Sequence, residues 1–349
     1  MAGDIISETA LKDFVATALG RVGMGPDNAR RAADVFVEAD LRGIDSHGVA
    51  GLSGRITTMK AGKLNVDAVP TLVRQIGNTA LLDGHQGFGP SLCTIVIETA
   101  VKLAAEGGIG LAAIRDSSHW ACPAYYSRWM ANQGFIAISM TNTNPGMPLY
   151  GSAAKSVTNA PIAIAAPRRG HEPIVLDMSL QQVSWSGMKI FADDGARLPG
   201  LWGYDEKGKE TDDPVVIART GRVKPIGDYK GSGFAFMQEI LTGVLGAGMI
   251  SAQIGAMTQK GEPAHYSQTF IAIRPDIFAS RAEYDAQIDA LYNTAKASPL
   301  AEGFSEINLP GDRSNATFAI RRRDGIPLKR IRKSLEEISS TLDLPRPWL

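Results

Sequence analysis

The chain has 349 residues, of which 36 are basic, 36 are acidic and 44% are hydrophobic. This length suits one large or two ordinary domains, and the balanced charge argues against a general nucleic-acid or membrane surface. No run reaches the roughly 18 apolar residues of a membrane span. Two cysteines, Cys93 and Cys122, make no disulfide framework, and the N-terminus does not resemble a signal peptide. We therefore expect a soluble, cytoplasmic protein.

The first 62 residues predict three helices. Ser7 can cap a helix whose apolar residues recur at three- and four-residue spacing. Pro26 suits the first turn of a second helix, which Gly43 would end. A third helix is expected from about Val49 to Lys60.

From residue 71 the pattern changes to short runs of β-forming residues separated by turns and helices. Strands are expected within residues 71–84, 108–114, 135–142, 160–167, 173–179 and 270–275. Helices are expected at residues 90–106, 231–245 and 284–297, the second of them buried. Strands that alternate with helices predict an α/β or α+β core with a mixed sheet.

The amphipathic pattern of residues 328–342 predicts a helix that packs back on the N-terminal helices. We therefore expect a helical domain of residues 1–70, joined by residues 325–349. Residues 71–324 would form the α/β core. The chain contains no internal repeat.

Two of the five histidines, His47 and His119, lie in polar clusters at the ends of expected elements. His47 follows Asp45 and Ser46 at a helix boundary, and His119 lies in RDSSHW after the expected strand GIGLAAI. Histidine titrates near neutral pH and suits proton transfer to a carbonyl oxygen. Ser46 could orient the imidazole of His47 or relay its proton. The alternative is that Asp45 and Ser46 only cap the next helix and that His47 is a surface histidine.

Several common signatures of catalysis are absent from the sequence. There is no GxGxxG after a strand, no Walker P-loop, no GxSxG and no HExxH. His119 and Cys122 have a spacing seen in metal sites, but no second pair of ligands is within reach, so no metal is expected.

Other polar stretches can bind a ligand. The stretch MTNTNPGMPLYGSAAKSVTNAP, which includes Thr143, predicts a loop rich in hydroxyls and amides. Asp177 and Ser179 end the expected strand PIVLDMS. Lys230 lies just before a helix start, where free amides and a cation favour an anion. Each also has a plain interpretation, as an ordinary long loop or a solvated lysine.

Six blocks occur in order between residues 45 and 312: DSHGV, SSHWACPAYYSRWMANQGFIAISMTNT, PIVLDMS, YKGSGFAFMQEILTGVL, YSQTFIAI and INLPGD. Together they resemble the malate/L-lactate dehydrogenase-like oxidoreductases, a family separate from the Rossmann-type dehydrogenases, and the 2,3-diketo-L-gulonate reductase branch is the most similar in its motifs. The resemblance implies a homodimeric oxidoreductase that uses NAD or NADP. It also implies a non-Rossmann dinucleotide-binding core, which would account for the missing GxGxxG. Residues 71–324 would then bind both nucleotide and substrate.

The resemblance also implies roles for individual residues. His47 would donate the proton to the substrate carbonyl with help from Ser46. His119 would lie at the nicotinamide and the substrate, with acid–base duty in some members. The residues implied in dinucleotide binding are His119, Thr143, Pro173, Ile174, Val175, Leu176, Asp177, Met178, Ser179, Tyr229, Lys230, Gly311, Asp312 and Arg313; Thr143 would also contact the substrate. The candidates for binding a 2′-phosphate, or else plain surface charges, are Arg168, Arg169 and Lys189.

These roles fit one reaction. A hydride would pass between C4 of nicotinamide and the carbonyl or hydroxyl carbon of a 2-keto or 2-hydroxy acid, or of a keto sugar acid. A proton donor such as His47 typically contributes about 10²–10⁴-fold. The alternatives are an NAD(P)H-dependent cyclic imine reductase, a cofactor-free lyase or isomerase that uses the two histidines, and a dinucleotide-binding protein that has lost catalysis.

The sequence departs from the family pattern at one position. Members usually have SHGVxR, in which the arginine binds the substrate carboxylate in bidentate fashion, and here that position is Gly51. Arg55 lies four residues later, on the same face if the segment is helical, and is the expected substrate-binding replacement. The other explanation is a substrate that is larger or lacks a carboxylate at that place.

Overall fold

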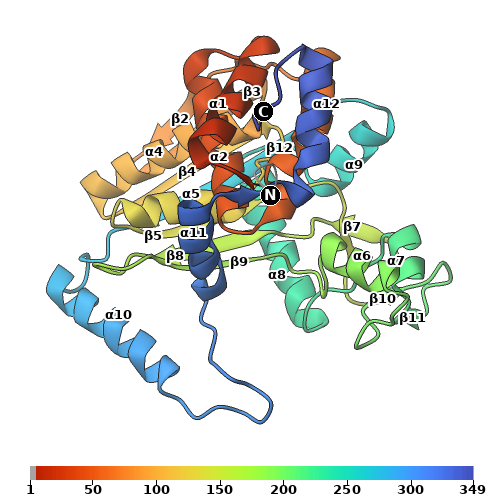
Figure 1. Cartoon of the computed structure of the whole chain (residues 1–349). Helices are drawn as coiled ribbons and strands as arrows, with labels where there is room; N and C mark the ends of the chain where they lie inside the picture. The colour runs from red at the N-terminus through yellow and green to blue at the C-terminus, as the bar shows by residue number, and fades with distance from the viewer. Residues whose placement is uncertain (1–4, 349) are drawn as a thin grey trace.

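A seven-stranded mixed sheet runs through the centre of the computed structural model, which describes residues 5–348 (Figure 1). From one edge to the other the strands are β2 (Thr71–Ile76), β3 (Thr79–Gly87), β4 (Ile109–Ser117), β12 (Tyr266–Ile273), β5 (Ile136–Thr141), β8 (Ile162–Ala166) and β9 (Ile174–Met178). β3 and β4 run parallel, and the other neighbouring strands run antiparallel. The expected α/β class and mixed sheet are confirmed.

β12 is the central strand, because it pairs with β4 on one side and with β5 on the other. Helices α4 (Gly89–Gly107) and α5 (Pro123–Asn132) cover one face of the sheet. α8 (Tyr229–Glu239) and the π-helical turn Ile240–Val244 that follows it lie on the other face (Figure 1). Both faces of the central strands are thus removed from water, which explains their apolar runs.

The segment of residues 231–245 is helical, but the expectation that it is buried is wrong for its outer face. Gln238, on the inner side, is buried. The outer side chains of Phe236, Leu241 and Val244 have exposed fractions of 52%, 42% and 54%. An apolar helix is buried on all sides only where a further layer covers it, and no described part of this chain covers these three side chains.

The N-terminal helices are α1 (Glu8–Arg21), α2 (Pro26–Leu41) and α3 (Leu52–Lys60). Ser7 caps α1 as expected, since its Oγ accepts the amide N–H of Ala10 at 3.2 Å. The third helix begins at Leu52 instead of Val49, because Asp45–His47 and Val49–Gly51 form two 3₁₀ turns. Gly48 has an extended backbone between the two turns and interrupts the helix.

The C-terminal residues close over the N-terminal helices. Helix α12 (Arg332–Leu342) packs against α3 and α1, and β13 (Ile326–Pro327) pairs with β1 (Ile5–Ile6). One continuous apolar core extends from these helices to α4 and the sheet. The division of the chain at residues 70 and 325 stays a prediction.

A small lobe lies beside the β9 end of the sheet (Figure 1). It contains α6 (Trp185–Asp193), α7 (Pro214–Thr220), β10 (Gly203–Tyr204) and β11 (Glu210–Thr211), none of which the sequence analysis anticipated. The lobe has an apolar core of its own, formed by Met188, Leu198, Ile217 and Val223.

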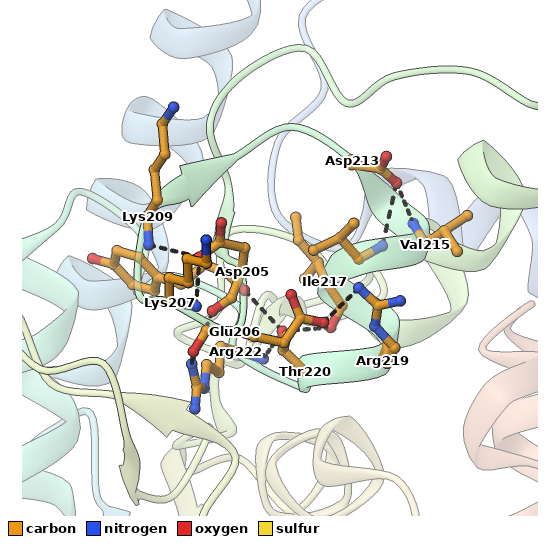
Figure 2. Close-up of polar contacts among 12 residues, drawn as sticks. Asp205, Glu206, Lys207, Lys209, Asp213, Val215, Ile217, Arg219, Thr220 and Arg222 are labelled. Carbon is orange, nitrogen blue, oxygen red and sulfur yellow. Dashed lines mark hydrogen bonds and ion pairs between the residues drawn. The ribbon is translucent and has the colours of Figure 1, made fainter.

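Figure 2 shows the polar contacts that hold the turns of this lobe. Asp213 caps α7, since its Oδ1 accepts the amide N–H of Val215 at 2.9 Å. Arg219, near the end of the same helix, pairs with Glu206 at 2.5 Å. Exposed ion pairs contribute only about 0–1 kcal/mol each, so the apolar core is the main determinant of the position of α6.

The remaining helices are α9 (Ser251–Gln259), α10 (Arg281–Lys296) and α11 (Asp312–Asp324). A hairpin of β6 (Met147–Pro148) and β7 (Lys155–Val157) lies in the loop expected over residues 140–161. α10 and the loop after it project from the body of the molecule (Figure 1). Among residues 5–348, no helix combines the length and the apolar content needed to cross a lipid bilayer.

Candidate active site

Three strands of the sheet deliver the predicted site residues to the same edge. β4 and β5 both run antiparallel to β12, so they point the same way, and two further antiparallel steps through β8 give β9 that direction too. His119 follows β4, Thr143 follows β5, and Asp177 lies at the end of β9. The carboxyl ends of these strands therefore bring together residues that are far apart in the sequence.

The loop that carries Asp45, Ser46 and His47 is fixed by ion pairs. Arg321 on α11 and Arg330 both hold Asp45, with Nη1–Oδ1 and Nη1–Oδ2 distances of 2.7 Å and 3.5 Å. Neither 3₁₀ turn nor α3 has a side-chain cap, so the capping interpretation of Asp45 and Ser46 is wrong. Asp45 instead anchors the histidine loop to the C-terminal part of the chain.

Asp40, near the end of α2, supports the same loop from the protein interior. Its fully buried side chain accepts the amide N–H of Val49 on Oδ2 at 2.9 Å. A Cβ at Gly48 would lie 2.0 Å from Asp40 Oδ1, so only glycine fits between the carboxyl group and the loop. Oδ1 has no hydrogen-bond partner among the described residues. Burial raises the pKa of Asp40 to about 8, so the group is protonated at neutral pH.

His47 and His119 lie side by side in the wall of a cavity of about 630 Å³, which we call the histidine cavity. Their ring centroids are 6.3 Å apart and the rings are inclined by 25°. Ser46 Oγ lies 2.8 Å from Nδ1 of His47. Burial, and then the positive charge of Arg55, lower the pKa of His47, and the same causes hold the pKa of His119 well below its ordinary value. Both imidazoles are therefore neutral at pH 7.

The wall of the histidine cavity contains most of the predicted catalytic and substrate-binding residues. The predicted residues in this wall are Ser46, His47, His119, Thr143, Asp177, Met178 and Ser179. The wall residues that the sequence analysis missed are Ile44, Trp120, Pro123, Asn159, Pro161, Gln181, Ser184 and Trp185. These are mainly apolar and amide residues of loops and helix starts, so no sequence signal distinguishes them from ordinary loop residues.

Two further cavities continue from the histidine cavity along β9. The β9 cavity, of about 550 Å³, shares Ile44 and Asp177 with the histidine cavity. The outer cavity, of about 280 Å³, shares Pro310 with the β9 cavity and reaches Tyr292 on α10. The predicted cofactor residues in these two walls are Val175, Leu176, Asp177, Gly311 and Arg313 for the β9 cavity, and Pro173, Ile174 and Asp312 for the outer cavity.

Arg128 on α5 is a candidate binding residue that the sequence analysis missed. It lines the β9 cavity, although the residue as a whole is only 2% exposed. Its Nε and Nη1 have no hydrogen-bond partner among the described residues, and Glu38 Oε1 lies 3.8 Å from Nη1. A buried cation with unused donors is unfavourable unless an anion satisfies it. The one available signal was a single arginine in the mostly apolar helix YYSRWM.

The backbone approaches closely at Gly311, in the wall of the β9 cavity. This residue has a φ of 97°, and a Cβ there would lie 3.1 Å from the amide nitrogen of Val175. The same amide donates to the carbonyl of Pro310 at 3.2 Å. The loop before α11 therefore lies directly against β9, and a side chain at position 311 would separate the two.

Some predicted cofactor residues lie away from these walls. Tyr229 and Lys230 are exposed at the start of α8 and line none of the three cavities. Arg168 lines the outer cavity, whereas Arg169 and Lys189 line none of the three. The roles of these five residues stay predictions.

Arg55 lies against His119 and does not line the histidine cavity. Its Nη2 lies 3.1 Å from Nδ1 of His119, and its Nη1 donates to the His119 carbonyl at 3.4 Å. Both residues border a separate cavity of about 350 Å³, which we call the Arg55 cavity. A Cβ at Gly51 would meet no atom within 4 Å. The expected binding of a substrate carboxylate by Arg55 stays a prediction, and its guanidinium already has a partner.

Known proteins of one family are similar to this chain over almost its whole length. A family model described as malate/L-lactate dehydrogenase matches residues 6–336. L-sulfolactate dehydrogenase of Methanocaldococcus jannaschii is 32% identical, over 95% of this chain and 96% of that protein. Its solved structure matches with a TM-score of 0.90 at 31% identity, covering 97% of this chain and 98% of that chain.

Two other relatives have different names. 2,3-diketo-L-gulonate reductase of Escherichia coli is 29% identical, over 87% of this chain and 90% of that protein. The solved structure of Δ1-piperideine-2-carboxylate reductase from Pseudomonas syringae matches with a TM-score of 0.84 at 26% identity, covering 96% of this chain and 99% of that chain.

We expect Asp40→Asn to change how stability depends on pH. The folded chain holds the Asp40 proton up to about pH 8, whereas the unfolded chain releases it near about pH 4. Through this group the wild type therefore loses stability as the pH rises from about 4 to about 8. The variant has no such proton, so its melting temperature relative to the wild type should be higher at pH 8 than at pH 5.

Differential scanning calorimetry at the two pH values measures this difference. Asp193→Asn, at a side chain that is 64% exposed, is the matched control and should show no such trend. If the melting temperatures of Asp40→Asn and the wild type differ by the same amount at pH 5 and at pH 8, the raised pKa of Asp40 is contradicted.

Proposed function

Because the chain belongs to the malate/L-lactate dehydrogenase family and is an oxidoreductase of CH–OH groups, we propose that it transfers a hydride between NAD or NADP and a small acid. The reacting carbon would be the carbonyl or hydroxyl carbon of a 2-keto or 2-hydroxy acid or of a keto sugar acid, with His47 as proton donor. The observation that carries the proposal is the pair of neutral imidazoles of His47 and His119 in the wall of one cavity.

His47 moves the proton in this proposal. A bound nicotinamide would supply or accept the hydride, and the substrate oxygen must gain or lose a proton at the same time. Ser46 occupies Nδ1 of His47 at 2.8 Å, so Nε2 is the nitrogen that exchanges a proton with a substrate in the histidine cavity. The lowered pKa keeps His47 neutral at pH 7. Neutral His47 can accept the proton of the substrate hydroxyl during oxidation. For reduction it must first take up a proton, which it then gives to the substrate carbonyl oxygen.

The residues along β9 fit a nicotinamide dinucleotide. Arg128 and Arg313 offer positive charge to a pyrophosphate in the β9 cavity, and Nε and Nη1 of Arg128 have no hydrogen bond among the described residues. The close approach at Gly311 lets backbone line the same wall. In the outer cavity the guanidinium of Arg168 lies 3.9 Å from the ring centroid of Tyr292, and Arg168 is the candidate for contact with a 2′-phosphate.

Gly51 bears on the choice of substrate. Position 51 has no side chain that could bind a carboxylate, which supports a substrate that is larger than a simple keto acid, or one without a carboxylate at that place. Gly51 itself is exposed and lines none of the cavities described above. A keto sugar acid meets the first condition. A cyclic imine is the second candidate, which the similarity to the Pseudomonas syringae reductase favours. The cofactor-free lyase or isomerase has no such support, because the family is one of oxidoreductases.

A homodimer is part of the proposal. Exposed apolar side chains on α8, in the turn after it and at the next residue include Phe234, Phe236, Met237, Leu241, Val244 and Leu245, which we call the α8 apolar patch. An exposed group of large apolar side chains on a folded chain marks an interaction surface. A second copy of this chain would cover it through the same patch, by twofold symmetry.

The proposed activity is tested by following oxidation of NADH and NADPH with a panel of 2-keto acids, keto sugar acids and cyclic imines. His47→Ala should bind the cofactor as the wild type does, measured by tryptophan fluorescence, while kcat falls at least about 10²-fold. His85→Ala, at a histidine outside the cavities, is the control. A kcat of His47→Ala equal to that of the wild type would contradict the proton-donor role of His47. If the wild type binds NADH or NADPH but oxidises neither with any substrate of the panel, the chain is a dinucleotide-binding protein without this catalytic activity.

We expect Arg128→Gln to weaken cofactor binding. A hydrogen bond to a charged group is worth about 1.5–3 kcal/mol, so the dissociation constants of NADH and ADP-ribose should rise by about 10- to 100-fold. The melting temperature without cofactor should change little, since the variant removes a buried charge that has only a long ion pair with Glu38, at 3.8 Å, and two nitrogens without a hydrogen bond. Fluorescence titration measures the binding, and Arg30→Gln, at an exposed arginine that lines none of the three cavities, is the control. Equal dissociation constants for Arg128→Gln and the wild type would refute the assignment.

Leu241→Asp should convert the proposed dimer into a monomer, because it places a charge among the exposed apolar side chains of the proposed interface. Light scattering after size exclusion should give twice the chain mass of 37.2 kDa for the wild type and one chain mass for the variant. Val215→Asp, at an exposed apolar residue on α7, is the control. A monomeric wild type, or a variant that stays dimeric, would exclude this interface.

A further inference from the structure

We propose that Arg55 is a positioning residue that fixes His119 as a neutral hydrogen-bond donor with its proton on Nε2. His119 would then remain a donor throughout the reaction, and His47 would be the histidine that changes its protonation state. This inference rests on the proposed hydride-transfer function. It assigns different roles to the two imidazoles of the site, those of His47 and His119.

Two donors converge on Nδ1 of His119. Arg55 Nη2 lies 3.1 Å from this nitrogen, and the amide nitrogen of Ala121 also lies 3.1 Å from it. A guanidinium has only donors, and an amide N–H likewise only donates. Nδ1 must therefore accept with its lone pair, and the single ring proton of neutral His119 must be on Nε2. An imidazolium would turn a further N–H toward the guanidinium, which geometry and charge both oppose.

Arg55 is held in the position that this role requires. Its Nη1 donates to the backbone carbonyl of His119 at 3.4 Å, and its guanidinium carbon lies 5.5 Å from the ring centroid of Phe36. Its Nε is buried and has no partner among the described residues. Because a guanidinium stays charged at all ordinary pH values, a positive charge remains beside His119 whatever the pH.

His47 has a different partner. The hydroxyl of Ser46 can donate to an unprotonated Nδ1 or accept from a protonated one, since a hydroxyl is both donor and acceptor. It lies 2.8 Å from Nδ1 and is exposed, so it is free to rotate. The partner of His47 therefore permits both protonation states, whereas the partners of His119 permit one.

The titratable and charged groups around His119 give no alternative partner for its Nδ1. His47 lies beside the ring and Tyr266 on β12 approaches it at 6.3 Å between centroids. Lys63 and Glu262 border the Arg55 cavity, and Lys63 Nζ donates to the carbonyl of Gly261 at 2.9 Å. Arg55 is the charged group that bonds the ring directly.

The arrangement gives His119 a defined task. It separates the Arg55 cavity from the histidine cavity, and its Nδ1 is used on the Arg55 side. Nε2–H is therefore the donor that is available to a substrate carbonyl oxygen in the histidine cavity. A fixed donor at a developing oxyanion typically contributes about 10²–10³-fold to kcat. Arg55 contributes to this effect without contacting the substrate.

The decisive measurement is the tautomer of His119 in the cofactor-free protein, by nitrogen-15 NMR of histidine-labelled samples, with His119→Asn to assign the signals. The wild type should show protonated Nε2 and unprotonated Nδ1 from about pH 5.5 to about pH 9, with no titration. Arg55→Met, which keeps the chain length, removes the positive charge and leaves the Ala121 amide as the one remaining donor to Nδ1. Part of its His119 population should then carry the proton on Nδ1, and the ring should titrate in this range. Lys63→Met, which removes a cation of the same cavity, should resemble the wild type.

Three results would overturn the proposal: a His119 that titrates in the wild type, a wild type with the proton on Nδ1, or signals in Arg55→Met that equal those of the wild type. The first two need no variant, so poor folding of Arg55→Met cannot hide a failure. Arg55→Lys, which restores a charged donor, should restore part of the Nε2–H population.

Steady-state kinetics separates this role from binding of a substrate carboxylate by Arg55. A positioning role predicts that Arg55→Met lowers kcat by about 10²-fold and leaves KM nearly unchanged. Loss of a carboxylate-binding residue instead raises KM at constant kcat. If the wild type oxidises no cofactor with any substrate, the proposed function fails, and the NMR result still decides whether Arg55 fixes the tautomer of His119.

Discussion

The pairing of β12 between β4 and β5 decides where the functional side chains of this protein lie. Both neighbours run antiparallel to β12, so their carboxyl ends meet at one edge of the sheet, and β9 ends there as well. His119, Thr143 and Asp177 reach that edge from three separate strands. The same edge in a parallel sheet would need a crossover helix for each strand. This antiparallel order places the candidate binding residues in one row of cavities along β9. The sequence needs no GxGxxG motif for that arrangement.

Three titratable side chains that line or support the site have unused polar atoms. Asp40, Arg55 and Arg128 each have at least one buried polar atom without a partner among the described residues. Arg42 is buried as well, but it pairs with Glu38 and with a second carboxylate. A buried charge that is paired can be purely structural, whereas an unpaired one lowers stability and needs another explanation. Arg128 has one long ion pair with Glu38, at 3.8 Å, and two buried nitrogens without a hydrogen bond, and Arg55 has an imidazole and a carbonyl as partners. For both residues the explanation is the chemistry of the adjoining cavities.

Local patterns in the sequence were enough for much of the fold. The cap at Ser7, the helix pattern near both termini and the runs of β-forming residues depend on neighbours within one or two turns, and the structure has these elements. The short helices α6 and α7 were not anticipated, because their position depends on the core around Met188 and Ile217. The outer face of α8 was wrongly predicted as buried. The apolar sequence of this helix does not reveal whether another layer of the same chain covers that face.

Some features of the candidate site also follow from the sequence, and others depend on the tertiary structure. The sequence determined that a serine–histidine pair follows the second helix, that His119 follows a strand and that position 51 is glycine. Only the tertiary structure decided that His47 and His119 share a cavity and that Arg128 lines the next one. It also decided that Arg55, whose contact with the substrate stays a prediction, lies within hydrogen-bond distance of His119. The direction of a long side chain depends on atoms from distant segments that pack around it, and local spacing contains no information about those atoms.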